Sequence, residues 1–125
     1  MNEGLLLDEI LSISDEIRYA ALYRDGELTS AVRAGLKDAS ASESDRYEEL
    51  IVNPALLTLA RQRGEIDCGG CRFVLVGYGN FYQFVTPVAG GHVSVCISRG
   101  APVMSLVEKI YEALGGLAEA PPRGK

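Results

Sequence analysis

The sequence is poor in the residues that carry most protein chemistry. It has no tryptophan, one histidine, two methionines and three cysteines among 125 residues. Its basic residues are scattered, and 17 Asp and Glu against 12 Lys and Arg give a net charge of −5. Because an acidic chain without a basic patch repels phosphate backbones, nucleic-acid binding is not expected.

Long apolar runs and export features are also missing. No stretch approaches the roughly 20 apolar residues that a membrane-crossing helix needs, so no membrane span is expected. The first nine residues, MNEGLLLDE, have no basic segment, and acids interrupt their apolar run. They do not resemble a signal peptide. With only three cysteines, the sequence predicts a reducing, cytoplasmic location.

The composition that remains is that of one globular domain. Hydrophobic residues make up 47% and charged residues 23%, and this length suffices for a single core. We predict one domain over residues 1–116, in which Gly115-Gly116 ends the last helix. Residues 117–125 contain Pro121-Pro122 and are predicted to form a flexible tail.

The first half of the chain predicts a helix, a hairpin and a second helix. Apolar residues recur at helical spacing over residues 2–12. Strand-forming residues over 17–23 and 28–33 flank an Asp-Gly pair at 25–26, which tolerates the positive φ angles of a tight turn. A polar connection then leads into a helical pattern over residues 44–64.

Alternation sorts the first strand into two faces. One set is Ile17, Tyr19, Ala21 and Tyr23, and the other is Arg18, Ala20 and Leu22. Neither set is cleanly polar, so we expect both faces of the sheet to be at least partly covered.

Asn53-Pro54 interrupts the central helical pattern. Proline lacks an N–H and clashes with the preceding turn. The helix therefore either kinks here, or ends and restarts with Asn53 as cap and Pro54 in its first turn. The sequence leaves both arrangements open, and the restart is the favoured one.

The second half predicts three strands and a final helix. The strands cover residues 71–77, 81–88 and 92–98, and short Gly-containing turns make neighbours antiparallel. An apolar stripe over residues 103–114 forms the helix. We predict an α+β domain, with one five-stranded antiparallel sheet, helices on both faces and the order α-β-β-α-β-β-β-α.

This order resembles that of profilin-like domains and, among them, the roadblock family of dynein light-chain-like domains. The best local match is NFYQFVTPVAGGHVSVCIS, from Asn80 to Ser98. IRYAALYRDGE, from Ile17 to Glu27, resembles the family's opening hairpin, and the likeness extends over about Glu3 to Leu114. It implies a small homodimer without enzymatic activity or cofactor, serving as a scaffold or regulator for a small GTPase, a motor or a signalling partner.

The resemblance also implies an interface. Members of this family commonly pair through the central helix and an adjoining strand, and the central helix here is residues 44–64. The predicted interface residues are Tyr47, Leu50, Ile51 and Phe73. Tyr47 is the aromatic candidate, since aromatic residues left exposed tend to mark contact surfaces.

Cys68-Gly-Gly-Cys71 is the sharpest local motif. A thioredoxin-type pair follows a strand and opens a helix, whereas this pair precedes a strand. A zinc site needs four ligands, and His92 and Cys96, about 13 Å apart on one strand, cannot easily complete it. The favoured interpretation is a Gly-Gly loop between two small thiols, with a thiol-redox or metal-binding protein as an alternative.

A second alternative is a PAS-like sensor, whose element order is similar and whose small-molecule ligand lies between sheet and helices. An apolar internal cavity there would favour it, and a filled core would disfavour it. The other polar features have ordinary interpretations: a hairpin turn at Gly77-Tyr78-Gly79, a turn-edge His92 sharing a strand face with Ser94 and Cys96, and solvated or first-turn acids at Glu48-Glu49.

Overall fold

The computed structural model of the chain describes residues 3–36 and 42–117. The helices are α1 (Glu3–Ser12), α2 (Ser42–Tyr47), α3 (Asn53–Asp67) and α4 (Val103–Leu114). The strands are β1 (Ile17–Arg24), β2 (Glu27–Val32), β3 (Val74–Gly77), β4 (Phe81–Val88) and β5 (Gly91–Ser98). A π-helical turn, η1 (Glu48–Val52), joins α2 to α3, and a 3-10 turn, η2 (Gly115–Leu117), follows α4.

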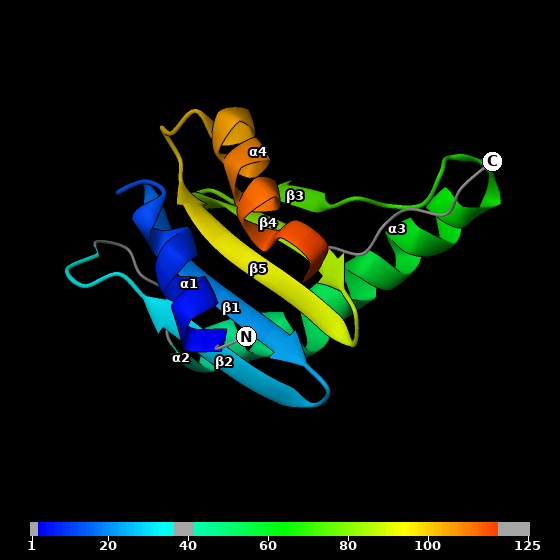
Figure 1. Cartoon of the computed structure of the whole chain (residues 1–125), viewed down its shortest axis with the longest axis horizontal. Helices are drawn as coiled ribbons and strands as arrows, with labels where there is room; N and C mark the ends of the chain where they lie inside the picture. The colour runs from blue at the N-terminus through cyan, green and yellow to red at the C-terminus, as the bar shows by residue number, and fades with distance from the viewer. Residues whose placement is uncertain (1–2, 37–41, 118–125) are drawn as a thin grey trace.

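The five strands form one sheet in the order β2-β1-β5-β4-β3, and every neighbouring pair is antiparallel. Figure 1 shows α1 and α4 on one face of this sheet, and α2 and α3 on the other. The predicted α+β fold, with a single antiparallel sheet covered on both faces, is confirmed.

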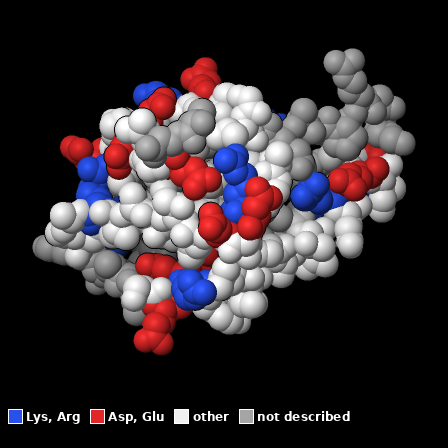
Figure 2. All heavy atoms as spheres, turned by 60° about the horizontal axis from the view of Figure 1, so that its bottom comes forward, with Lys and Arg blue, Asp and Glu red and all other residues white. Residues whose placement is uncertain are grey.

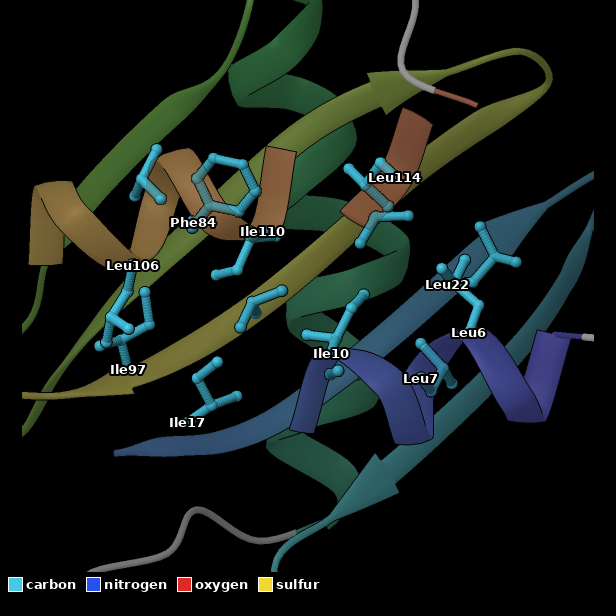
Figure 3. Close-up of a cluster of buried hydrophobic side chains, with 14 of the residues drawn as sticks. Leu6, Leu7, Ile10, Ile17, Leu22, Phe84, Ile97, Leu106, Ile110 and Leu114 are labelled. Atoms are coloured by element: carbon cyan, nitrogen blue, oxygen red, sulfur yellow. The ribbon is translucent and has the colours of Figure 1, made fainter. Parts of the chain in front are cut away.

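The hydrophobic core lies between the sheet and the pair α1 and α4. Figure 3 shows side chains from these two helices pointing onto β1, β4 and β5. Its largest fully buried members include Leu7, Ile10, Ile17, Leu22, Phe84, Ile97, Ile110 and Leu114. We call this the apolar face of the sheet.

The two faces of β1 are not divided as strict alternation predicts. Ile17 lies in the same cluster as Ala20 and Leu22, whereas Tyr19 and Ala21 face the opposite side. The pairing of β1 with β5 shifts register between Ile17 and Tyr19. A bulge at that point turns Ile17 to the other face.

The β1–β2 turn confirms the role of its Asp-Gly pair. Asp25 has φ of 53° and Gly26 has φ of 84°, as both central residues of a type I′ turn require. The first strand after the central helix is shorter than predicted, because β3 begins only at Val74. Just before β3, the Thr86 hydroxyl donates a hydrogen bond to the Arg72 carbonyl at 2.7 Å. This side-chain contact takes the place of the backbone hydrogen bonds that would pair two strands.

The central helix does not end and restart at Asn53, although the sequence favoured that arrangement. Asn53 is helical, with φ of −63° and ψ of −45°, and its N–H bonds to the Glu48 carbonyl five residues earlier. The helical stretch is thus continuous from Ser42 to Asp67. The wider π turn receives Pro54, whose ring would clash with the carbonyl of Leu50 in a regular α-helix.

The 3-10 turn η2 overlaps the first residue of the predicted tail. Leu117 closes η2 and packs against the core, one residue beyond the predicted boundary. The predicted tail from residue 118 onwards lies outside the described residues.

Candidate functional site

Tyr47 and Ile51, two of the predicted interface residues, are exposed on the central helix. Their relative exposures are 60% and 54%, and Leu59 at 66% and Ile66 at 70% continue along the helix. Steps of four, eight and seven residues keep these side chains on one side of a helix. We call these four residues the central-helix stripe. Leu50, also predicted, is only partly exposed.

Phe73 lies apart from this stripe. Its ring is 5.4 Å from the ring of Phe84, and it packs against the cluster between the sheet and α1 and α4. Phe73 therefore belongs to the apolar face, on the side of the sheet away from Tyr47 and Ile51.

The Cys68-Gly-Gly-Cys71 motif forms the loop that leaves α3. The Cys68 thiol is 3.3 Å from Asp67 Oδ1, and the Cys71 thiol is 3.6 Å from the Phe73 carbonyl. Both cysteines are free, and burial raises the pKa of Cys71. Within residues 3–36 and 42–117, no three His, Cys, Asp or Glu side chains are grouped so that they could hold a metal ion.

The most concentrated polar site is one that the sequence did not predict. Glu49 is 1% exposed, and its Oε1 lies 2.7 Å from Nε2 of His92. Ser94 Oγ donates to Glu49 Oε2 at 2.5 Å, and Asn53 Nδ2 donates to Oε1 at 3.1 Å. Three groups thus satisfy one buried carboxylate, which is how a buried charge is tolerated.

One prediction is wrong at this cluster. Glu49 is not a solvated acid, because the helix lies against the sheet and its hydrogen bonds compensate for burial. His92 lies beside the β4–β5 turn, as predicted, since its strand begins at Gly91, but it is 2% exposed and faces the helix. The signal available in the sequence was the alternation of the polar residues His92, Ser94 and Cys96, which predicts that they share one face of the strand. The contacts that His92 and Ser94 both make with Glu49 confirm this shared face for those two residues.

This cluster does not have the order of a nucleophilic triad. In such a triad the histidine lies between the serine and the acid. Here the acid lies between Ser94 and His92, and both contact its carboxylate. The arrangement binds the central helix to β5, which makes it a structural anchor.

A pocket of about 340 Å³ opens beside this anchor, between the sheet and the start of the central helix. Its lining residues come from the strands, the central helix and the β3–β4 turn: Tyr19, Ser44, Asp45, Glu48, Glu49, Tyr78, Gly79, Asn80, Phe81, Gln83 and Cys96. The Tyr78 hydroxyl closes one wall by donating to the Glu48 carboxylate, at 3.0 and 3.3 Å. Burial, followed by the charge of Glu48, raises the pKa of Tyr78 to about 12.

Tyr19 and Cys96 form the floor of this pocket. Burial first, and then the Glu49 charge, raise the pKa of both groups far above their ordinary values. The Cys96 thiol donates to Gln83 Oε1 at 2.8 Å. The floor therefore presents a neutral phenol, a neutral thiol and an amide.

No helix among the described residues has the length and hydropathy to cross a membrane.

The five-stranded sheet, with two helices on one face and the long central helix on the other, has a roadblock-like fold. A solved Roadblock/LC7 domain from Streptomyces avermitilis is similar, with a TM-score of 0.66 at 20% identity over 91% of this chain and 95% of that one. The gliding protein MglB from Thermus thermophilus is similar too, with a TM-score of 0.63 at 16% identity over 92% and 87%.

A third structure, described as MglB with a tetrameric arrangement, has a TM-score of 0.65 at 15% identity over 92% of this chain and 86% of that one. No protein-family model matches the sequence, and no curated protein is similar to it in sequence. At these identities the likeness is one of fold, and it confirms the roadblock-like architecture that the element order predicted.

Proposed function

We propose that this protein is a non-enzymatic scaffold or regulator that acts as a homodimer, paired through the central-helix stripe. The observation that carries the proposal is the row Tyr47, Ile51, Leu59 and Ile66, which leaves four large apolar side chains exposed on one side of one helix. Single exposed apolar residues are ordinary, whereas a continuous apolar stripe is typical of an interaction surface.

The position of α3 supports pairing. Figure 1 shows the far end of this helix extending beyond the edge of the sheet. A helix that projects in this way buries only part of its surface within its own chain, and its buried residues are Asn53, Leu57 and Gly64. The opposite side is accessible to a second copy.

The size of the surface indicates that the helix does not act alone. From Ser42 to Asp67 the helical stretch is about 39 Å long and about 10 Å wide, which gives roughly 400 Å² per partner. Stable interfaces bury about 800 Å² per partner. We therefore include β3, which is an edge of the sheet and offers backbone groups for pairing.

The comparisons support an assembling module, since one similar structure is described as a tetrameric arrangement. The resemblance to the roadblock family also implies the partner class, a small GTPase or another signalling protein. The mixed surface charge of the protein is compatible with such a partner: on the face drawn in Figure 2, acidic and basic side chains are interspersed.

Light scattering of the purified chain tests the pairing. The expected mass is twice the 13.4 kDa of one chain. Ile51→Glu combined with Leu59→Glu should reduce it to the monomer, because two facing copies would bury four unpaired carboxylates. Met104→Glu is the matched control, since Met104 is 53% exposed on α4 and lies outside the stripe.

A wild-type monomer at high micromolar concentration would contradict the pairing, and so would a double variant that stays dimeric. The partner class is tested separately, by titrating the protein into a fluorescent small GTPase loaded with GDP or with a GTP analogue. Saturable binding to either form is expected, and no binding to both forms would contradict the partner proposal alone.

A further inference from the structure

We infer that the pocket between the sheet and the start of the central helix binds a small organic amine, one that carries a hydrogen-bond acceptor on an apolar or aromatic body. This inference goes beyond the pairing role. The residues of the central-helix stripe do not line the pocket, so a ligand and a second copy would occupy different surfaces.

The charge of the lining residues selects a cation. The charged ones are Asp45, Glu48 and Glu49, and all three are acidic. Glu49 already accepts from three partners within the chain. Asp45 and Glu48 are therefore the carboxylates that can accept from an ammonium group.

The surroundings of Glu48 make a cation favourable there. Burial raises the pKa of Glu48, and the charges of Glu49 and Asp45 add to this effect, while the hydrogen bond from Tyr78 opposes it. An ammonium group beside Glu48 would stabilise its ionised form. The Arg18 guanidinium, which would repel a second cation, lies 5.8 Å from the Phe81 ring centre in a smaller adjoining hollow and does not line this pocket.

A buried donor selects the second feature of the ligand. Gln83 is 1% exposed, and its Oε1 accepts from Cys96, but its Nε2 has no hydrogen-bond partner among the described residues. An unsatisfied buried donor is costly and calls for an explanation. Gln83 lines the pocket, so the partner that we propose for its Nε2 is an acceptor atom on a ligand, such as a hydroxyl or ring nitrogen.

Aromatic walls select the body of the ligand. Tyr19, Tyr78 and Phe81 line the pocket, and the rings of Tyr78 and Phe81 meet edge to face at 5.5 Å. Aromatic faces attract cations and cover apolar groups. A volume of about 340 Å³ is at the small end of ligand pockets, which start near 300 Å³, so it suits an amine with one ring.

The test uses the full-length protein and three amines, tyramine, histamine and benzylamine, followed by NMR chemical-shift titration into the millimolar range. Saturable shifts with tyramine or histamine are expected, with benzylamine weaker because it lacks an acceptor. The neutral 4-(2-hydroxyethyl)phenol should bind at least about tenfold more weakly than tyramine, and 3-(4-hydroxyphenyl)propanoate should not bind. Saturation by none of the amines, or equal affinity for the neutral and cationic probes, would overturn the inference.

Two variants separate the parts of the site. Glu48→Gln should weaken all three amines about tenfold, whereas Glu43→Gln, an exposed acid on α2 outside the pocket, should leave them unchanged. Gln83→Met should weaken tyramine about tenfold and leave benzylamine unaffected. Equal responses of Glu48→Gln and Glu43→Gln would exclude the site.

Light scattering of the same samples keeps this result apart from the proposed pairing. If the protein has the mass of a dimer but binds none of the amines, only the inference about the pocket is contradicted, and the proposed pairing stands. A monomer that binds amines would contradict the pairing and leave the pocket intact.

Discussion

The two faces of the sheet are both covered by helices, but by opposite means. Under α1 and α4 the contacts are almost entirely aliphatic and aromatic, with Ile10, Phe84, Ile97 and Ile110 fully buried. Under the central helix the cluster around Glu49 and the amide of Gln83 are buried instead. We call this second side the polar face.

The two faces therefore have different roles: one supplies folding stability, and the other fixes the position of the central helix. Apolar burial is favourable in proportion to area and tolerates small shifts between layers. A buried carboxylate with three partners does not tolerate such shifts, because each lost hydrogen bond leaves a polar group buried without a partner. The apolar face therefore supplies most of the folding energy, while the polar face fixes where the central helix lies, and with it the stripe and the pocket.

The largest effect is expected on the apolar face. Phe84→Ala should lower the free energy of unfolding by about 3–5 kcal/mol, because it opens a cavity beneath α4. Met104→Ala on α4, where the side chain is exposed, should change it by less than about 0.5 kcal/mol. Urea unfolding followed by circular dichroism measures both, and similar losses would contradict the division of the faces.

The next effect is expected at the carboxylate of the polar face. Glu49→Gln should destabilise the protein by about 1–3 kcal/mol, since an amide nitrogen would face donors that a carboxylate accepts. Replacing the whole group by apolar residues, as Glu49→Leu with His92→Leu and Ser94→Ala, should recover part of the loss seen for Glu49→Leu alone. Additive losses in the triple variant would show that these residues do not act as one unit.

A smaller effect should distinguish the three thiols. Burial, followed by the charge of Glu49, strongly raises the pKa of Cys96, and burial raises the pKa of Cys71. Since the thiolate is the reactive form, Cys96 should react with a disulfide reagent at least about tenfold more slowly than the exposed Cys68. Single-cysteine variants measure the rates, and denaturant should make them equal. Equal rates in the folded state would refute the buried position of Cys96.

The smallest effect is a pH dependence at Glu48. Because burial raises its folded-state pKa above the ordinary 4.5, this group favours folding most below pH 4.5, and the contribution is lost as the pH rises through the raised pKa. The free energy of unfolding of Glu48→Gln, relative to that of the wild type, should therefore increase as the pH rises, by no more than about 0.5 kcal/mol. Paired thermal unfolding at about pH 4 and about pH 7.5 tests the sign, and a gain at the lower pH would contradict it.

The apolar face and the sheet were predictable from the sequence because their signals are local. Periods of two and of about 3.6 residues mark the strands and helices, and Asp25-Gly26 marks the hairpin turn. The sequence alone therefore assigns residues such as Phe84 and Ile110 to the correct elements.

The polar face was not predictable, because its partners are distant in the sequence. His92 lies 43 residues from Glu49, and Ser94 lies 45 residues from it. Adjacent acids at Glu48 and Glu49 look solvated in a regular helix, and only the π turn, which the sequence did not predict, places them as observed. The same holds for Phe73, whose strand pattern did not reveal which face it occupies.

By itself, the sequence determined the order of the elements, the antiparallel pairing of consecutive strands and the apolar stripes, since these follow from residues within a few positions of one another. Only the tertiary structure decided which acid is buried, which aromatic is exposed and where a pocket opens. Those outcomes depend on how two layers meet, and hydrogen bonds between distant residues settle that by the cost of leaving any buried polar group without a partner.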